Sequence, residues 1–328
     1  MKLDKNFIEN IILKNKNIYI TGHIDADLDA IASSVGFAHL LKELGRNSSI
    51  VVDDKNLEYG TNQVAQEFRE EFNIIDSKDV DSEDSVLVIL DTNKRELVSK
   101  KLLSKIQNIV IIDHHNTGED TIDTKNLYVN KETSSASEIV VNLFMNLKMK
   151  IKSSVATALL SGIILDTNRF MIKTDVDTMR AVYYLFENGA DSNKANSRFV
   201  ETLNNYKVQQ KVILNAKLKD GIAISKGLNK AIYRREDLAK IADTLLRFQK
   251  VEASIVIANL KESKVGMSIR SQKEDIDASI IASHFGGGGT KTEAAAKIKN
   301  MKLSTVYKEL INYLENKEEE WKLYSLKI

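Results

Sequence analysis

The sequence predicts an α/β protein: a doubly wound parallel-sheet domain, a helical linker and a smaller α/β domain. Two observations support this fold class. Along the first 115 residues, short runs rich in isoleucine and valine alternate with helical patterns, which is typical of parallel βαβ units. Near residue 220 a second series of apolar runs begins, and 328 residues suffice for two ordinary domains. We therefore expect the first domain at 1–191, the linker at 192–219 and the second domain at 220–328.

Each predicted strand is a short apolar run between polar residues. In the first domain these runs cover 17–21, 49–52, 85–91 and 108–113. Apolar residues at helical spacing predict a helix over 27–45, between the first two strands. In the second domain the expected strands are 222–225, 230–233, 253–258 and 265–269. We expect a helix over 276–284, then a run of glycines, and another helix that begins near Thr292.

Composition narrows the class of protein. Hydrophobic residues make up 43% of the chain and charged residues 28%, which is enough to build a sizeable core. The formal net charge of +1 argues against a general binder of long nucleic acids. The absence of cysteine excludes disulfides, thiolate metal sites and cysteine nucleophiles. No apolar stretch could span a bilayer and no signal peptide is visible, so we expect a cytoplasmic protein without a membrane partner.

Acids and histidines gather where apolar runs of the first domain end. They are His23, Asp27, Asp29, Asp91, Asp113, His114, His115 and Asp166. Ligands of open α/β sheets bind beyond the carboxyl ends of the strands, so these side chains should meet at one edge. Taken singly, each has an ordinary explanation, since an aspartate such as Asp27 caps a helix. Taken together, the carboxylates would repel one another unless a cation compensated their charge, so we expect a metal site.

The ligand types indicate which metal and which reaction to expect. Imidazoles with several carboxylates and no sulfur suit Mn²⁺ or another first-row ion better than structural zinc. Five or six such ligands are enough for two ions with a bridging carboxylate, and two ions can activate a water for attack on a phosphoryl group. The sequence contains no serine nucleophile elbow and no GxxxxGK[ST] loop, so serine hydrolysis and NTPase chemistry are not supported.

Six motifs occur in the order in which one family carries them: HIDADLD, ILDTN, IDHHN, SSASE, GIILDTNRF and HFGGGG. On these motifs the chain resembles the DHH phosphoesterases, with a DHH domain followed by the first type of DHH-associated domain. The resemblance extends from about residue 17 to about residue 299. It implies a phosphodiesterase that depends on two divalent metal ions, with Mn²⁺ the expected metal.

The resemblance also assigns roles to residues at matching positions. The implied ligands are, for one ion, His23 and Asp27, and, for the other, Asp29, His114 and Asp166. Asp91 would bridge the two ions and is counted among the catalytic residues. His115 would be the other catalytic residue, which faces the substrate and assists with the phosphate or a proton. Asp113 would orient a histidine rather than bind metal.

The C-terminal half looks most like the cyclic-di-AMP phosphodiesterases, on the segments ADTLLRFQKVEASIVIA and VGMSIRSQ and on the glycine run. Arg270 is the expected phosphate clamp, because a guanidinium fork suits bidentate contact. Glycines let backbone N–H groups approach a phosphate closely. The family's loop normally ends in histidine, whereas this chain has Thr290, whose hydroxyl reaches less far. The expected substrate contacts are Arg270, Ser268, Ser271, Gly286, Gly287, Gly288, Gly289 and Thr290.

The expected activity is hydrolysis of cyclic di-AMP, of linear pApA, or of both, to AMP. Two alternatives stay open. One is a nano-RNase that also dephosphorylates 3′-phosphoadenosine 5′-phosphate, and the other is a nucleotide-binding sensor with weak catalysis. The expected partners are therefore cyclic or short linear dinucleotides, and the sequence leaves a homodimer open.

Overall fold

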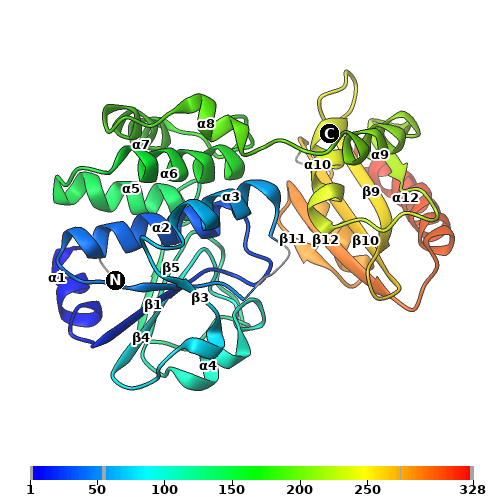
Figure 1. The fold of residues 1–328 in the computed structure, drawn as a ribbon. Helices are drawn as coiled ribbons and strands as arrows, with labels where there is room; N and C mark the ends of the chain where they lie inside the picture. The colour runs from blue at the N-terminus through cyan, green and yellow to red at the C-terminus, as the bar shows by residue number, and fades with distance from the viewer. Residues whose placement is uncertain (1–2, 54–56, 274, 326–328) are drawn as a thin grey trace. The chain divides into compact units, whose positions relative to one another are not determined.

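The computed structural model describes residues 3–53, 57–273 and 275–325, with side chains described as far as residue 316. The chain forms two compact units, Met1–Val200 and Glu201–Ile328 (Figure 1). Each unit has its own sheet and its own hydrophobic cores. Each unit is therefore described by itself.

A parallel sheet of six strands forms the centre of the first unit, in the order β3-β2-β1-β4-β5-β6. All neighbouring strands run parallel, which confirms the predicted parallel sheet. The central strand β4 is buried along its whole length, as expected of a strand covered on both faces. The four predicted strands are present, and β3 and β6 are additional. The strands are β1 (Asn17–Thr21), β2 (Ser49–Val51), β3 (Ile74–Ile75), β4 (Ser85–Leu90), β5 (Ile109–Asp113) and β6 (Asn126–Val129).

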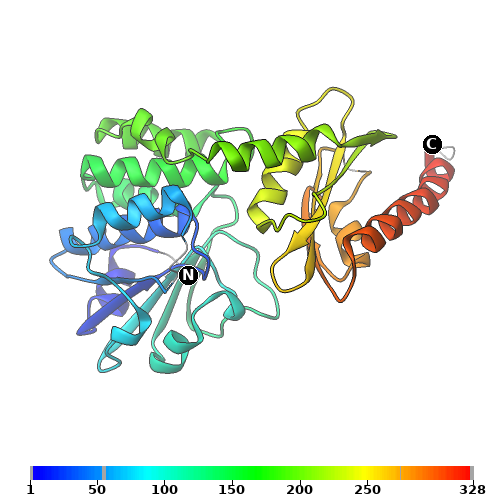
Figure 2. The same ribbon diagram turned by 45° about the vertical axis from the view of Figure 1, so that its right-hand side comes forward.

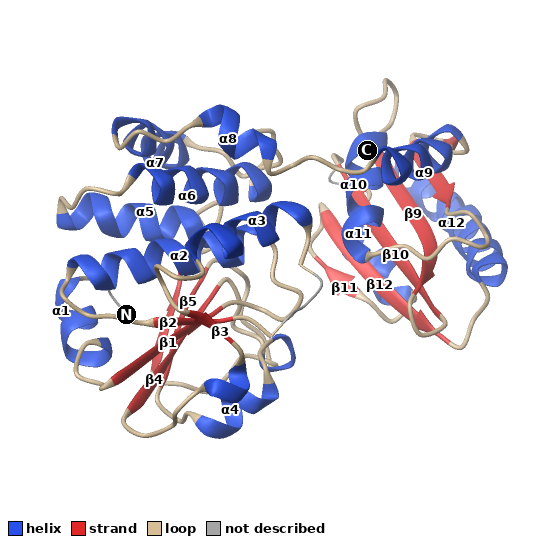
Figure 3. Ribbon diagram, viewed as in Figure 1, coloured by secondary structure: helices blue, strands red, loops and turns tan. Residues whose placement is uncertain are grey.

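Helices cover both faces of this sheet (Figures 1 and 3). On one face lie α2 (Leu28–Glu43), α3 (Tyr59–Phe68), α5 (Ala136–Leu147) and α6 (Ser153–Asp166), with α7 (Val176–Glu187) and α8 (Ser192–Ser197) outside them. Helix α2 is buried almost all round because it packs on the sheet on one side and on α5 and α6 on the other. The opposite face is covered by α4 (Lys100–Lys105), whose Leu102 belongs to the same buried cluster as Leu87 and Ile89 of β4. Short helical segments complete the unit: α1 (Lys5–Phe7), a π-helix at Ile8–Ile12, and 3₁₀ turns at Ser77–Asp79 and Arg95–Leu97.

The second unit contains a mixed sheet of six strands, in the order β11-β12-β10-β9-β8-β7 (Figure 2). Its strands are β7 (Lys217–Lys219), β8 (Ile222–Lys226), β9 (Ala253–Leu260), β10 (Lys264–Ser271), β11 (Gly288–Gly289) and β12 (Glu293–Lys299). Strands β8 and β9 run parallel, and the other neighbours run antiparallel. The helices are α9 (Leu203–Leu214), α10 (Arg235–Leu245), α11 (Ala278–His284) and α12 (Leu303–Ser325). Side chains of α9 and α10 share one core with the sheet, and those of α11 and α12 share another.

Two predictions for the second unit are wrong. The segment 230–233 is not a strand but part of an irregular connection, in which Tyr233 N donates to Asn259 O at 2.8 Å. No helix begins near Thr292, because the next residues form β12 and pair with β10. The alanine-rich segment has good helix propensity. Its residues are nevertheless alternately buried and exposed, which is the two-residue period of a strand.

The segment predicted as a helical linker, 192–219, contains α8 of the first unit and α9 and β7 of the second. The two units meet in sequence between Val200 and Glu201, in the irregular segment between α8 and α9. Among the described residues, no helix is both long enough and apolar enough to cross a membrane.

Candidate metal centre

The candidate metal centre lies in the first unit, at the carboxyl ends of β1, β4 and β5. From β1 the chain passes to β2 on one side, while β4 lies on the other side of β1. The boundary between β1 and β4 is therefore a topological switch point, where α/β proteins form a crevice outside the strand ends. The strand order thus explains why side chains from three different strands converge there.

One group of side chains consists of His23, Asp27 and Asp91, whose ligand atoms lie within 4.8 Å of one another. His23 Nε2 lies 3.6 Å from Asp27 Oδ2 and 3.6 Å from Asp91 Oδ2. Asp27 also caps α2, because its Oδ1 accepts hydrogen bonds from the backbone N–H groups of Asp29 and Ala30 at 2.9 and 3.0 Å. The capping and ligand interpretations of Asp27 are therefore compatible, since each uses a different oxygen.

A second group consists of Asp29, Asp91, His114 and Asp166, again with ligand atoms within 4.8 Å of one another. His114 Nε2 lies 3.2 Å from Asp91 Oδ1 and 3.2 Å from Asp166 Oδ2. Asp91 belongs to both groups and faces each with a different oxygen. It follows β4 with a φ of +63°, a left-handed conformation that aspartate tolerates better than most residues. A carboxylate can bridge two metal ions only if it lies between their two groups of ligands, and Asp91 belongs to both groups.

The N-terminus of helix α5 binds the buried side chain of Asp29. Asp29 Oδ2 accepts a hydrogen bond from Ala136 N at 2.7 Å, and Asp29 Oδ1 accepts one from Ser137 N at 3.0 Å. A helix N-terminus stabilises negative charge, because its first N–H groups have no partner within the helix. Ser135 caps the same helix by accepting from Glu138 N at 3.0 Å. The SSASE motif thus positions a predicted metal ligand that is more than 100 residues away in sequence.

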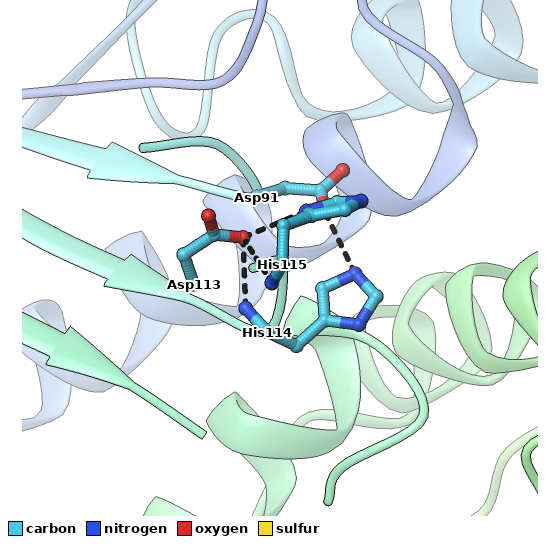
Figure 4. Close-up of side chains that lie close together, drawn as sticks. All are labelled: Asp91, Asp113, His114 and His115. Carbon is cyan, nitrogen blue, oxygen red and sulfur yellow. Dashed lines mark hydrogen bonds and ion pairs between the residues drawn. The ribbon is translucent and has the colours of Figure 1, made fainter. Parts of the chain in front are cut away.

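Asp113 orients the two histidines that follow it. Its Oδ1 accepts hydrogen bonds from His114 N at 2.7 Å, from His115 N at 3.2 Å and from His115 Nδ1 at 2.8 Å (Figure 4). Its Oδ2 accepts from Asn93 Nδ2 at 2.6 Å. Burial raises the pKa of the Asp113 carboxyl, but the hydrogen bond and charge of His115 bring it below its usual value. A charged, fully hydrogen-bonded Asp113 fits the orienting role better than a ligand role.

Sequence reasoning missed Asn93, which is fully buried. In addition to its bond with Asp113, Asn93 Oδ1 accepts a hydrogen bond from Thr121 Oγ1 at 3.1 Å. The only signal in the sequence was its position two residues after Asp91, in the ILDTN motif. Asn93 and Thr121 therefore fix the orientation of Asp113, and through it that of His115.

Two observations show that the residues present fit divalent cations. Asp91 Oδ1 and His114 Nε2 are buried, yet neither forms a hydrogen bond with a described residue. The pKa of Asp91 is raised well above its usual value by burial and by the charges of Asp29, Asp27 and Asp166. Buried carboxylates in such proximity cannot all be ionised without compensation. A set of imidazoles and carboxylates without sulfur matches the preferences of ions such as Mn²⁺.

Metal binding is expected to strengthen as the pH rises from about 6 to about 8, because ligands must lose protons to bind. Burial lowers the pKa of His23, but the hydrogen bond and charge of Asp27 raise it to about 10. Burial and the charge of Asp166 raise the pKa of Asp29 to about 7. In the metal-free protein the protonated forms of His23 and Asp29 therefore stabilise the folded state. This stabilisation is lost as the pH rises through their pKa values.

Melting temperatures with chelator and with Mn²⁺ test this expectation. The increase on adding Mn²⁺ should be larger at about pH 8 than at about pH 6, because fewer protons then compete with the ion. An equal increase in melting temperature at both pH values would contradict the idea that the ligands lose protons when the metal binds.

In the second unit, Arg270 of β10 is held by an ion pair with Asp243 of α10. Arg270 Nε donates to Asp243 Oδ1 at 2.7 Å, and Nη1 donates to Ser268 Oγ at 3.3 Å. Ser268 and Ser271 are buried, and Ser271 Oγ donates to Lys273 O at 2.9 Å. The arginine therefore has a defined orientation near the C-terminal end of β10. Contact between these residues and a nucleotide stays a prediction.

The predicted glycine loop precedes a strand rather than a helix. Gly286–Gly289 lie between α11 and β12, and the last two glycines pair with β12. A Cβ atom on Gly287 would lie 2.1 Å from Ala295 O, so close backbone packing itself requires this glycine. Thr290 Oγ1 accepts from Glu293 N at 3.1 Å and can donate to Glu293 O at 3.2 Å. The Thr290 hydroxyl therefore caps a turn and would have to exchange these bonds to reach a phosphate.

Two family models match the chain. The model described as "DHH family, N-terminal domain" matches residues 17–163, and the "DHHA1 domain" model matches residues 213–318. The chain is 32% identical over 317 residues to the cyclic-di-AMP phosphodiesterase GdpP of Bacillus subtilis, covering 92% of this chain and 48% of that protein. It is 29% identical over 321 residues to the cyclic-di-AMP phosphodiesterase PdeA of Listeria monocytogenes, covering 94% and 49%. The chain thus spans about half the length of these relatives.

Solved structures share the fold at low sequence identity. An exopolyphosphatase-related protein from Bacteroides fragilis superposes with a TM-score of 0.77 at 20% identity, covering 97% of this chain and 96% of that chain. RecJ from Thermus thermophilus, in complex with Mn²⁺, superposes with a TM-score of 0.55 at 13% identity, covering 94% and 54%. At these identities the similarity supports the arrangement of the sheets and helices alone.

Proposed function

Since the chain belongs to the DHH family and carries a DHHA1 domain in its C-terminal part, we propose that it is a metal-dependent phosphodiesterase that hydrolyses cyclic di-AMP, linear pApA, or both, to AMP. The observation that carries the proposal is the convergence of two ligand groups on Asp91 at the switch point of the sheet. The names of GdpP and PdeA support the substrate class, because both match this chain across both of its domains.

The proposed ligands of the two ions are the two groups of the metal centre. His23 and Asp27 would hold one ion, Asp29, His114 and Asp166 would hold the other, and Asp91 would contact both. When bound, two such ions stabilise charge on a phosphoryl group and activate a water for attack on phosphorus. The protein's own contribution is to hold the ligands in place, through the α5 N-terminus at Asp29 and through Asp113 at the histidine pair.

His115 is the proposed residue that acts on the substrate. Its Nδ1 is engaged with Asp113, and the side chain is 49% exposed, so its Nε2 remains to meet the substrate. Attack of water on phosphorus breaks the P–O bond to the leaving nucleoside, whose oxygen takes up a proton. Donation of that proton, or a hydrogen bond to the phosphate, is the role we assign to His115.

Arg270→Ala is expected to raise the KM for cyclic di-AMP about tenfold to a hundredfold, because a charge-assisted hydrogen bond contributes about 1.5–3 kcal/mol. The number of bound metal ions should not change, since the metal ligands lie in the first unit. Steady-state kinetics and metal titration of the same preparations measure both quantities. The exposed Arg235, replaced by alanine, is the matched control. An unchanged KM would show that Arg270 does not bind the substrate.

The test of the proposed function compares cyclic di-AMP with pApA in separate reactions with Mn²⁺, with products followed by chromatography. Conversion of either dinucleotide to AMP supports the proposal. The dinucleotide that is converted faster shows whether the enzyme prefers a cyclic or a linear substrate. Tight binding of cyclic di-AMP without turnover would instead support a sensor. Turnover confined to longer RNA fragments would contradict the proposed substrate class.

A further inference from the structure

Arg270 of the second unit lies between two carboxylates. Helix α10 packs on β10 (Figure 3), and its Asp243 Oδ1 accepts a hydrogen bond from Arg270 Nε at 2.7 Å. On the neighbouring strand β12, Glu293 is directly opposite Arg270 in the antiparallel register. Side chains of directly opposed residues point to the same face of a sheet, with Cβ atoms about 4.5–5.5 Å apart. Arg270 is therefore flanked by Asp243 from the covering helix and by Glu293 from the adjoining strand.

The charges around Arg270 balance one another. Burial raises the pKa of Asp243 above its usual value, the charge of Arg270 opposes that shift, and the charges of Glu293 and Arg247 act on it in opposite directions. The side chains of Arg270 and Asp243 are only 15% and 28% exposed, so salt screens their interactions less than at an open surface. Two arginines and two carboxylates thus leave this site without net charge before a ligand binds.

The guanidinium of Arg270 presents one nitrogen to a ligand. Nε is engaged with Asp243, and Nη1 donates to Ile269 O at 3.1 Å and to Ser268 Oγ at 3.3 Å, so Nη2 is the nitrogen without a partner among the described residues. Nη2 carries two N–H groups. A phosphodiester has two unesterified oxygens and one negative charge, whereas a terminal phosphate has three such oxygens and a charge of about −1.5 to −2 at pH 7. The two donors therefore match a diester and leave one oxygen of a terminal phosphate without a partner from Arg270.

We infer that Glu293 makes this site select a singly charged phosphodiester over a doubly charged terminal phosphate. A site without net charge does not attract the second charge, while the cost of removing an ion from water grows with the square of its charge. The inference rests on the proposed function for one step, the contact between Arg270 and the nucleotide. It favours cyclic di-AMP, in which both phosphates are diesters, over linear pApA, whose 5′ end is a terminal phosphate.

Glu293→Gln removes the charge and keeps the shape of the side chain. The turn before β12 should persist, because the backbone N and O of Glu293 bond with the Thr290 hydroxyl at 3.1 and 3.2 Å and the side chain takes no part in these bonds. The site then becomes positive, and a doubly charged ligand gains twice as much from this change as a singly charged one. One unit charge a few ångström away in water changes an affinity by a factor of about 2–5. The variant should therefore raise kcat/KM for pApA about twofold to fivefold more than kcat/KM for cyclic di-AMP.

Two further variants separate the effect of charge from that of structure. Glu293→Asp keeps the charge and should keep the wild-type preference. Glu262→Gln is the matched control, because it removes the same charge from an exposed residue that precedes β10. The six residues of strand from Lys264 to Arg270 span about 20 Å, which exceeds the Debye length of about 8 Å at physiological salt. This control should leave the preference unchanged, and thermal melts should show that all three variants fold.

Binding of AMP and of its methyl ester to the metal-free full chain tests the site without catalysis. The two ligands share the nucleoside, and their phosphates differ by up to about one charge. Calorimetry in chelator should show that the methyl ester binds the wild-type protein at least as tightly as AMP does. Glu293→Gln should tighten AMP about twofold to fivefold more than the ester. Arg270→Ala should abolish the binding of both ligands, which would place them at this site.

The inference and the proposed function fail in different ways. Equal effects of Glu293→Gln on AMP and its methyl ester would overturn the inference. Binding that survives Arg270→Ala, or a chain that binds neither ligand, would overturn it as well. If the proposed function alone is wrong, neither dinucleotide is hydrolysed, while Glu293→Gln still shifts the preference between AMP and its methyl ester.

Discussion

Asp91→Asn is expected to reduce turnover of cyclic di-AMP about a thousandfold or more. Its two oxygens face different ligand groups, 3.2 Å from His114 Nε2 and 3.6 Å from His23 Nε2. An amide has one oxygen and no charge, so it cannot serve both groups. The magnitude follows because metal ions contribute several kcal/mol to stabilising a phosphoryl transition state, and each 1.4 kcal/mol is tenfold in rate.

The same substitution should have the opposite effect on the stability of the metal-free protein. The raised pKa of Asp91 means that its ionisation opposes folding at neutral pH, when Asp29, Asp27 and Asp166 surround it. A neutral amide removes that repulsion. The melting temperature in chelator should therefore rise, by about 2–4 °C for each kcal/mol of repulsion removed.

Three measurements on Asp91→Asn separate these effects: turnover, metal stoichiometry, and melting temperature with and without Mn²⁺. The combination expected is lost turnover, lost metal stabilisation and a more stable metal-free protein. A variant that keeps two tightly bound ions would show that Asp91 does not bridge them. Asp25→Asn is a useful control, since Asp25 is exposed in the same motif and lies outside the described ligand groups.

Gly162→Ala is expected to weaken metal binding and to destabilise the protein by about 1–3 kcal/mol, the usual cost of overpacking a core. A Cβ atom at this position would lie 2.2 Å from Ser137 Oγ and 2.5 Å from Asp29 Oδ1. Asp29 Oδ1 accepts a hydrogen bond from Ser137 N at the α5 N-terminus, and Ser137 Oγ belongs to the same serine. Elsewhere in a helix, the same change would be expected to stabilise by about 0.5–1 kcal/mol. A loss of stability would therefore show that the site has no room for a methyl group, whereas a gain in stability would show that helix propensity decides the effect.

The free energy of unfolding and the affinity for Mn²⁺ check this prediction in the same preparations. Gly118→Ala is the control, because Gly118 is exposed and a Cβ there would meet only the end of the Asp120 side chain, at 3.2 Å. A Gly162→Ala protein that is more stable than wild type and binds Mn²⁺ normally would contradict the crowding around Asp29.

The clustering of the site could be predicted from sequence because the ligands directly follow strands. The runs before Asp91 and His114 are buried along nearly their whole length, so their ends and the edge they share are evident. Asp29 and Asp166 were expected at the same edge because they also follow apolar runs, but they lie on helices α2 and α6 rather than after strands. The resemblance to a family added only their assignment to one ion.

The parts of the structure that depend on contacts between residues far apart in the sequence could not be predicted. Strands β3 and β6 are short and only partly buried, so their sequences carry little pattern. Strand β12 has residues that favour a helix, and its pairing with β10 decides its structure. The bonds from α5 to Asp29, and from Asn93 to Asp113, join segments far apart in the chain, and neither local propensity nor motif spacing describes them.

The most direct test of the two-ion centre is to add Mn²⁺ back to the metal-free protein in steps and to follow the hydrolysis of cyclic di-AMP and pApA together with the number of ions bound. A two-ion centre should give no turnover in chelator, little after one ion per chain, and full turnover when two ions are bound. Full activity without metal, or after a single ion, would contradict a centre in which Asp91 joins two ligand groups.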